Sequence, residues 1–426
     1  MNDHINRWKI AIMGTVLQLC LGTVYAWSFF QKPLVNTFGW TNTQAAWAFS
    51  FAICFLGLAA AWGGINLPKY GPKKLAVIGG IFYGSGYLIT AVALFIKSLA
   101  LMYLGFGVIG GIGLGLGYVT PVATAAKWFP DKKGFITGMV VMGFGLGALL
   151  MSKVIAPYLM VVTEGNLIKV FGLIGVVMLV LTFPAGITLK NPPLNYMPKG
   201  WKPAAVSKEK EAANDKLTAK QCLLSSRFLM MWLIFFFNIT AGIMFIGFQS
   251  PMLQDLLKKL NSTMSTAELA AAGASLIAIS SVFNGLGRFF WGWISDHFGR
   301  VKTFRLILGT QILVFAILPF IKSPIIFGIF VSYVLLCYGG GFGTMPSFVL
   351  SVFGHRLMAV IYGVILTAWS MGGIVGPQLA AFIKDNFSAN APYYTFGSGA
   401  ILLFIGLGIA FLLKDEPYNP HYVEGV

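Results

Sequence analysis

Twelve apolar stretches, each long enough to cross a lipid bilayer, follow one another along the chain. A spanning helix needs about 20 apolar residues, because the hydrocarbon core of a bilayer is ~30 Å thick. Hydrophobic residues make up 57% of the chain and charged residues 10%, which is typical of integral membrane proteins. We therefore expect an all-α protein of the lipid bilayer with twelve transmembrane helices. Their predicted spans are about 8–30, 43–65, 75–96, 99–126, 134–158, 167–188, 227–249, 268–294, 303–321, 325–351, 358–383 and 393–413.

Lysine and arginine residues gather in every second loop between these spans. The formal net charge of +17 would also suit a nucleic-acid-binding protein. Here, however, the charges follow the topology, since cytoplasmic loops of membrane proteins carry an excess of Lys and Arg. We therefore predict a multi-pass protein of the cell (inner) membrane, with cytoplasmic N- and C-termini and no nucleic-acid partner. The short loops with this excess contain Lys69, Lys73, Lys74, Lys127, Lys132, Lys133, Arg300, Lys302 and Arg305.

Residues 190–226 interrupt the apolar pattern. Asn191-Pro192-Pro193 ends a helix, and the segment from Lys199 to Lys220 mixes charged residues and proline with few large apolar side chains. We interpret residues 190–226 as a cytoplasmic linker, with docking of other proteins as the alternative. The linker separates an N-terminal six-helix bundle, residues 1–189, from a C-terminal six-helix bundle, residues 227–426.

The two halves repeat each other. Gly117–Thr120 aligns with Gly341–Thr344 at an offset of 224 residues, and Gly64–Lys74 aligns with Gly292–Lys302 at an offset of 228 residues. Nearly constant offsets indicate an internal duplication. Repeated halves are the usual basis of alternating access in membrane transporters, with the binding site near the midplane between them.

Arg288 lies inside the predicted span 268–294, while no Asp or Glu lies in the interior of any predicted span. An arginine in hydrocarbon costs at least ~2.5–3.5 kcal/mol on insertion scales, so it normally faces a bundle interior and has a partner. A ligand carboxylate is the obvious missing partner, because the planar guanidinium binds a carboxylate through two hydrogen bonds. In the alternative, Arg288 bonds backbone carbonyls and only holds helices together.

Three glycine runs, Gly111–Gly117, Gly143–Gly147 and Gly339–Gly341, superficially resemble nucleotide-binding loops. Each lies inside an apolar span, and none is joined to a Gly-Lys-Ser/Thr sequence. Small residues let membrane helices approach closely, so helix packing is the better interpretation. The four cysteines show no metal-ligand spacing, and no catalytic constellation is evident. We expect no cofactor, no metal and no enzymatic activity.

The twelve predicted spans, in two groups of six, and the repeated inner-loop motif give the chain a pattern that resembles the major facilitator superfamily. The second copy of the motif, Gly292-x3-Asp296-x2-Gly299-Arg300, is close to the superfamily's pattern. The resemblance implies that these residues act as the inner gate. In the first copy Pro68 replaces the acidic residue, which implies a looser gate on that side.

Within the superfamily, the chain is similar to the group of bacterial monocarboxylate transporters and oxalate/formate antiporters. Residues 22–28, 127–134 and 362–369 carry this similarity, together with the helix that contains Arg288.

Two positions depart from the patterns of that group. Asn284 stands where animal monocarboxylate transporters commonly have an aspartate implicated in proton coupling. Trp369 stands where oxalate/formate antiporters have a second cation, a lysine. The first departure leaves a proton without an obvious carrier, and the second disfavours a dicarboxylate substrate.

The candidate substrate site is centred on Arg288. It lies eight residues before Asp296, hence about 12 Å along the helix and near the middle of the membrane. Asn284 is one turn further out on the same face, where its amide binds a ligand oxygen or merely caps a helix contact. Buried phenols need partners, so the neighbouring tyrosines either line the site or bond nearby backbone. The predicted substrate-binding residues are Arg288, Asn284, Tyr118, Tyr338, Tyr25, Phe342, Tyr362 and Trp369.

These features favour a secondary active transporter of small monocarboxylates, such as lactate or pyruvate, that works by alternating access. Family resemblance favours symport with a proton, whereas anion exchange needs no proton carrier. The alternative is an antiporter of the oxalate/formate type. A receptor, an anion channel and an enzyme are less well supported, since the chain shows neither an output domain nor a catalytic constellation. We expect the transporter to act as a monomer.

Overall fold

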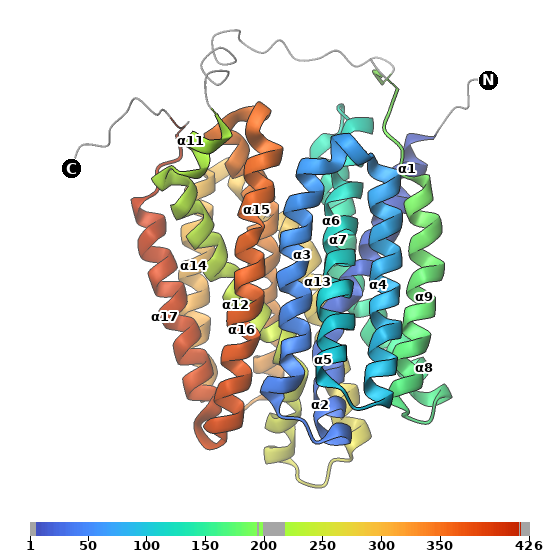
Figure 1. Ribbon diagram of the computed structural model, residues 1–426. Coiled ribbons are helices and arrows are strands. Elements are labelled where there is room, and N and C mark those ends of the chain that lie inside the picture. Colours follow the sequence, from blue (N-terminus) through green and yellow to red (C-terminus); the bar gives the residue numbers. More distant parts are fainter. Residues whose placement is uncertain (1–5, 194–195, 199–217, 417, 419–426) are drawn as a thin grey trace.

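The structure is a computed structural model that describes residues 6–193, 196–198, 218–416 and 418. Helices dominate these residues (Figure 1). The first half contains α1 (Arg7–Leu21), η1 (Gly22–Ala26), α2 (Trp27–Phe38), α3 (Asn42–Tyr70), α4 (Pro72–Phe95), α5 (Leu99–Met102), η2 (Tyr103–Ile109), α6 (Gly110–Trp128), α7 (Lys133–Leu150), η3 (Met151–Ile155), α8 (Ala156–Val162) and α9 (Leu167–Thr188). The second half contains α11 (Ala219–Leu223), α12 (Ser226–Leu260), α13 (Thr266–Phe298), α14 (Arg300–Ile317), η4 (Leu318–Phe320), α15 (Pro324–Ile365), α16 (Thr367–Asn386), η5 (Ser388–Asn390) and α17 (Ala391–Leu412).

The described residues form 12 helical spans that are long and apolar enough to cross a membrane. The prediction of an all-α membrane protein with twelve spans in two halves is therefore confirmed. Several helices run past their predicted spans: α12 continues to Leu260 and α13 to Phe298, so Asp255 lies on helix and not in a loop. The reason is that hydropathy registers the apolar part of a helix only. Gly354, with φ 77°, separates the tenth span from the eleventh within α15.

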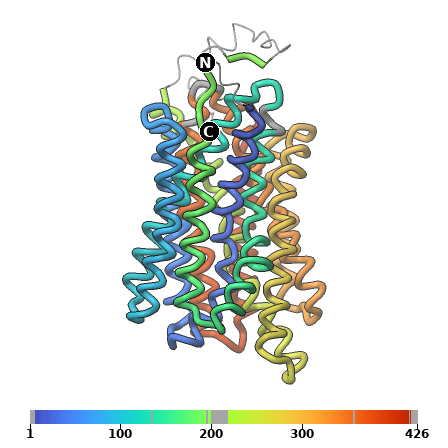
Figure 2. Tube along the Cα trace, turned by 90° about the vertical axis from the view of Figure 1, so that its right-hand side faces the viewer, coloured from blue at the N-terminus to red at the C-terminus, as the bar shows by residue number. Residues whose placement is uncertain are grey.

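The helices run along one common axis (Figures 1 and 2). We call the side on which α1 begins and α17 ends the terminal side, and the opposite side, where α2 ends at Phe38 and α12 ends at Leu260, the distal side. Within the first half α4 packs on α9 and α6, and within the second half α13 packs on α15 and α14 on α17. The two halves meet where α3 contacts α16, α7 contacts α13 and α2 contacts α12.

The glycine runs allow this close packing, as predicted. A Cβ atom on Gly115 would lie 2.3 Å from the Leu56 carbonyl oxygen of α3. A Cβ atom on Gly339 would lie 2.1 Å from the Asn284 carbonyl oxygen of α13. Because no real side chain fits at such distances, these positions hold neighbouring backbones in direct contact, in agreement with the role of small residues in membrane helices.

The predicted linker, residues 190–226, lies partly outside the described residues, which include 218–226 but not 199–217. The described part contains α11, which Thr218 caps at its N-terminus. The boundaries at residues 189 and 227 stay a prediction.

Candidate functional site

Arg288 of α13 lies between the two halves and is only 4% exposed. Its Nη1 lies 3.4 Å from the Tyr118 hydroxyl, at the long limit of a hydrogen bond. Its Cζ lies 5.1 Å from the centroid of the Phe342 ring, a cation–π contact. Nε and Nη2 are buried and have no hydrogen-bond partner among the described residues. Arg288 is thus not held by backbone carbonyls, and the alternative that it only ties helices together is not supported.

The unpaired atoms Nε and Nη2 form one edge of the guanidinium. Two parallel N–H groups on one edge match the two oxygens of a carboxylate. Ion pairs between other described residues lie near the helix ends, and Arg288 takes part in none of those that the described residues form. The centre of the molecule therefore offers a fixed positive charge with a free edge for an anion.

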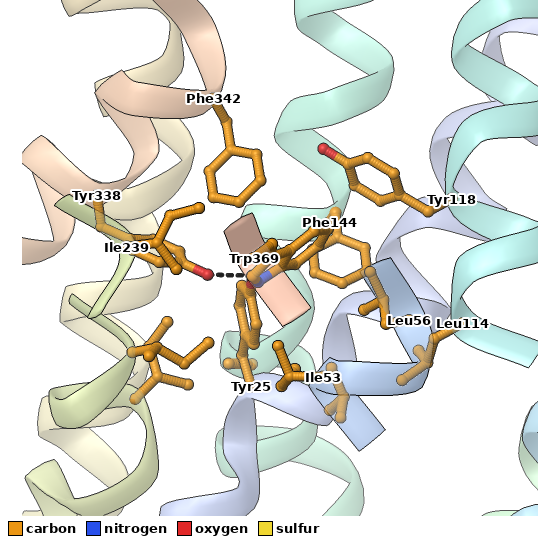
Figure 3. Close-up of a cluster of buried hydrophobic side chains, with 14 of the residues drawn as sticks. Tyr25, Ile53, Leu56, Leu114, Tyr118, Phe144, Ile239, Tyr338, Phe342 and Trp369 are labelled. Carbon is orange, nitrogen blue, oxygen red and sulfur yellow. Dashed lines mark hydrogen bonds between the residues drawn. The ribbon is translucent and has the colours of Figure 1, made fainter. Parts of the chain in front are cut away.

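Tyr118 of α6 and Phe342 of α15 occupy equivalent positions in the two sequence repeats, and both contact Arg288. Trp369 of α16 packs against both of them, with ring centroids 5.2 Å from Tyr118 and 4.7 Å from Phe342 (Figure 3). Trp369 is fully buried. Aromatic rings of both halves thus form one cluster beside the cation, and such a cluster suits a short carbon skeleton.

Tyr25 and Tyr338 join the two halves directly. Their hydroxyl groups lie 2.6 Å apart and form a hydrogen bond (Figure 3). Tyr25 belongs to η1, a 3₁₀ stretch that interrupts the first span between α1 and α2. Short 3₁₀ stretches inside a helix often mark a functional hinge. The first span is therefore interrupted at the level where its tyrosine reaches the other half.

Asn284 is one helical turn from Arg288 toward the distal side and is 1% exposed. Its carbonyl oxygen and its side-chain Oδ1 both lie beside Gly339 of α15, so backbone and side chain share this helix contact. Asn284 lines a cavity of about 10 Å³, together with Tyr25 and the hydrogen-bonded pair Ser280 and Gln249. A polar cavity of this size has room for about one water molecule. The Oδ1 atom of Asn284 has no hydrogen-bond partner among the described residues.

Tyr362 is half-buried and interacts electrostatically with Arg288 and Tyr118. The structure thus brings all eight predicted binding residues to one region. Sequence reasoning missed Phe144 of α7, whose ring centroid lies 5.0 Å from that of Tyr25 and 5.1 Å from that of Tyr118. The only sequence signal for Phe144 was its place inside the glycine run Gly143–Gly147.

The predicted gate residues lie apart from this site, at the terminal end of α13. Asp296 and Arg300 form an exposed pair, with 3.4 Å between Oδ1 and Nη2. Gly299 has φ 88°, which favours glycine, and ends α13. The Arg300 backbone N–H donates to Asp415 beyond α17. Gly292 faces Gly343, and a Cβ atom on Gly292 would lie 3.8 Å from the Gly343 carbonyl oxygen, an ordinary van der Waals contact. These contacts stay within the second half, and the gate role of the four residues stays a prediction.

Residues 10–377 match the family model of the Major Facilitator Superfamily. The chain belongs to this superfamily of membrane transporters and is not an enzyme. A solved structure supports the same fold: a bacterial homologue of the human lysosomal transporter Spinster, in an inward-facing and unoccupied conformation. It superimposes with a TM-score of 0.69 at 16% sequence identity and covers 99% of this chain and 100% of that chain.

Two relatives represent the subgroups that the sequence motifs indicated. The oxalate:formate antiporter of Oxalobacter formigenes is 26% identical over 421 residues, which cover 97% of this chain and 93% of the relative. Monocarboxylate transporter 12 of Rattus norvegicus is 22% identical over 427 residues, which cover 96% of this chain and 86% of the relative. The predicted kinship with both subgroups is confirmed.

Proposed function

We propose that this protein is a transporter of small organic anions and that its substrates are monocarboxylates such as lactate and pyruvate. The observation that carries this proposal is the buried, unpaired Nε–Nη2 edge of Arg288. A buried cation without a protein carboxylate calls for an anionic ligand. The names of the two relatives, an antiporter for oxalate and formate and a monocarboxylate transporter, support an organic anion.

The valence of the site favours one carboxylate over two. Arg288 with a monocarboxylate is close to neutral, whereas a dicarboxylate leaves one negative charge unpaired in a low-dielectric site. An uncompensated buried charge costs several kcal/mol. The indole of Trp369 packs against Tyr118 and Phe342, the two residues that contact the arginine, and it is apolar over most of its surface. This apolar surface accommodates the carbon chain of lactate better than the second carboxylate of oxalate.

In this proposal each predicted residue has a defined role. Arg288 binds the carboxylate, Asn284 and Tyr118 hydrogen-bond the remaining oxygens, and the aromatic rings enclose the carbon chain. The enclosing rings are those of Tyr25, Tyr338, Phe342, Tyr362 and Trp369. The proton of the proposed symport is carried by the substrate bound at Arg288, since the predicted site contains no carboxyl side chain and a guanidinium accepts no further proton.

The surrounding architecture follows from the same proposal. The two bundles act as a monomer in the cell (inner) membrane and rock against each other in alternating access. The positive-inside bias supports a cytoplasmic terminal side, so that Asp296 and Arg300 belong to an inner gate and the distal side faces outward.

Uptake by proteoliposomes tests the substrate and the coupling together. Radiolabelled lactate is measured at fixed pH with an excess of unlabelled lactate, pyruvate, formate or oxalate, and then with and without an inward proton gradient. We expect strong competition by lactate and pyruvate, weak competition by oxalate and faster uptake with the gradient. Oxalate that inhibits as strongly as lactate would overturn the monocarboxylate assignment.

Trp369→Lys sharpens this test, because it restores the second cation at the position where oxalate/formate antiporters have a lysine. We expect the competition by oxalate to increase relative to that by lactate. Trp369→Phe is the matched control, because it changes the ring without adding charge and should keep the original preference. A lysine variant that still excludes oxalate would show that charge at this position does not set the preference.

An antiporter of the oxalate/formate type is the second candidate, and the burial of Arg288 favours an exchange mode. A conformer that buries Arg288 without an anion carries an uncompensated charge, which raises the barrier for the return of the unloaded carrier. Preloading the vesicles with unlabelled lactate distinguishes the modes. Uptake that occurs only into preloaded vesicles identifies an exchanger.

A further inference from the structure

A serine of the second half bonds to the backbone of a helix in the first half. The Ser281 hydroxyl of α13 donates to the Gly145 carbonyl oxygen of α7 at 2.6 Å. It also accepts from the Leu149 backbone N–H at 3.2 Å. Gly145 and Leu149 are four residues apart, so their C=O and N–H groups are the natural partners of one α-helical turn. One side chain of the opposite half thus engages both ends of a backbone hydrogen bond of α7.

The local backbone is built for this contact. A Cβ atom on Gly145 would lie 2.8 Å from the Cα atom of Gly285, so α7 and α13 touch through glycine. The π-helical stretch η3 starts at Met151, directly after α7. Side chains that insert into the helical hydrogen-bond ladder and π-helical turns are both recognised causes of local helix distortion. Ser281, which is 2% exposed, therefore bonds the last turns of α7, just before the π-helical stretch begins.

The same turn of α7 positions a residue of the candidate site. Phe144 precedes Gly145, and its ring contacts Tyr25 and Trp369, with centroid distances of 5.0 Å and 5.8 Å. A Cβ atom on Gly147 would lie 2.3 Å from the backbone of Gly22, at the start of η1. The segment 143–149 of α7 is therefore packed between α13, which carries Arg288, and η1, which carries Tyr25.

We infer that Ser281 is a positioning residue of the transport cycle, which couples closure of the distal side to the placement of Phe144. When the distal side is closed, the Ser281 hydroxyl bonds α7. When the halves separate there, Gly145 C=O and Leu149 N–H bond each other, so no backbone group is left unpaired. The two arrangements differ by few hydrogen bonds, which suits an element that switches between two states. This inference rests on the alternating access of the proposed function.

The distance between spin labels on the two halves tests it. Labels are attached at Lys169→Cys of α9 and Lys322→Cys before α15, both exposed on the distal side. Cys54, which is half-buried, is replaced by alanine, and the other cysteines are buried. Pulsed electron spin resonance then gives the ratio of distal-open to distal-closed molecules.

Ser281→Ala removes the hydroxyl without a cavity of significant size. We expect the open-to-closed ratio to rise by about threefold to tenfold, the effect of a net loss of one hydrogen bond in the closed form. Ser275→Ala is the matched control. Ser275 lies on the same helix and accepts a hydrogen bond from Lys153 of the first half, but it does not bond the α7 backbone. Because that hydrogen bond is exposed and water can replace it, this variant should change the ratio by much less.

A second pair of variants guards against effects of size or folding. Ser281→Thr keeps the hydroxyl, and Ser281→Val has the shape of the threonine variant without the hydroxyl. The open population should therefore be larger in the valine variant than in the threonine variant. An equal ratio in both, or an equal shift with Ser275→Ala, would overturn the role of Ser281. If the parent protein shows one unchanged distance with every acid tested, the proposal of alternating access itself fails. That result differs from the results that would overturn only the role of Ser281.

Discussion

The two sides of the interface between the halves are held in different ways. On the distal side, the Asp255 carboxylate pairs with Lys32 of the first half at 2.8 Å and with Lys384 of the second half at 2.6 Å. Asp385 of α16 accepts hydrogen bonds from the backbone N–H groups at positions 42 and 43. A carboxylate of the second half therefore caps the N-terminus of α3 in the first half, where it also complements the helix dipole.

On the terminal side, the ion pairs that the described residues form stay within one half. Arg7 pairs with Asp131 at 2.7 Å and joins the start of α1 to the loop before α7. Asp296 pairs with Arg300 within the second half. Among the described residues, charged side chains thus join the two halves on the distal side, whereas the terminal ion pairs named here each lie within one half. Distal opening must break carboxylate contacts, whereas separation of the halves on the terminal side leaves these ion pairs intact.

The largest effect is expected at the centre, which both sides share. Arg288→Ala and Arg288→Lys should each reduce lactate uptake by more than tenfold, because a lysine does not reproduce the two parallel hydrogen bonds of the guanidinium edge. Arg305→Lys is the control for loss of a guanidinium, since Arg305 bonds backbone carbonyls of α17 away from the site. Membrane insertion is checked by the yield of folded protein. Normal uptake by Arg288→Ala would remove the site.

The next effect separates the distal side from the terminal side. Asp255→Asn removes both lysine pairs and leaves two lysines facing a neutral amide. Of these two pairs, only the Lys32 pair joins the two halves, and as a partly exposed pair it contributes about 0.2–1 kcal/mol. Without the carboxylate, Lys32 and Lys384 also repel each other across the interface, so the distal-open population should rise by up to roughly tenfold, as measured by the spin-label distance described above. Glu268→Gln is the control, because Glu268 bonds only Ser265 at the start of its own helix. If Asp255→Asn leaves the population unchanged, the distal side is not held by its charges.

A smaller effect is expected from Tyr118→Phe. The hydroxyl of Tyr118 lies 3.4 Å from Arg288, so its contact with the arginine is weak. Removal of the hydroxyl therefore acts mainly through loss of the proposed hydrogen bond to an anionic substrate. We expect lactate affinity to fall by about threefold to tenfold in a binding titration. Tyr362→Phe is the comparison variant, since Tyr362 is half-buried near the same arginine. Equal affinity for Tyr118→Phe and the parent protein would assign Tyr118 to packing.

The sequence was sufficient for the features that local patterns encode. Spans follow from apolar runs of fixed length, and Arg288 is conspicuous because it is charged inside one of them. The aromatic partners Tyr118 and Phe342 were accessible through the repeat, since equivalent positions of two halves converge on one centre.

Contacts between the halves were not predictable in the same way. Asp255 and Lys32 are 223 residues apart, and the partners of Ser281 are more than 130 residues away. No periodicity relates such residues, and each looks like an ordinary polar residue at a helix end or in a helix. Hydropathy also underestimated the length of α12, so the predicted span ended at residue 249 and Asp255 lay outside it.

The smallest effect is expected from the ion pair of the terminal side. The hydrogen bond from the Arg7 guanidinium lowers the pKa of Asp131 below its ordinary value. A carboxyl group with a lowered pKa in the folded state adds stability above the pKa that it has in the unfolded chain, and this stability disappears as the pH falls through the lowered value. Asp131→Asn should therefore lower the thermal unfolding temperature at neutral pH by roughly 1–2 °C, as expected for a partly exposed pair, and the two proteins should converge in acid.

This variant also tests the comparison of the two sides. Because Arg7 and Asp131 belong to the same half, the loss of their ion pair changes the stability of that half without favouring either conformer of the transporter. We therefore expect Asp131→Asn to leave the spin-label distances unchanged under the conditions in which Asp255→Asn shifts them. A shift of similar size would mean that the Arg7–Asp131 pair also responds to the movement of the halves, and the contrast between this pair and the Asp255–Lys32 pair of the distal side would then fail.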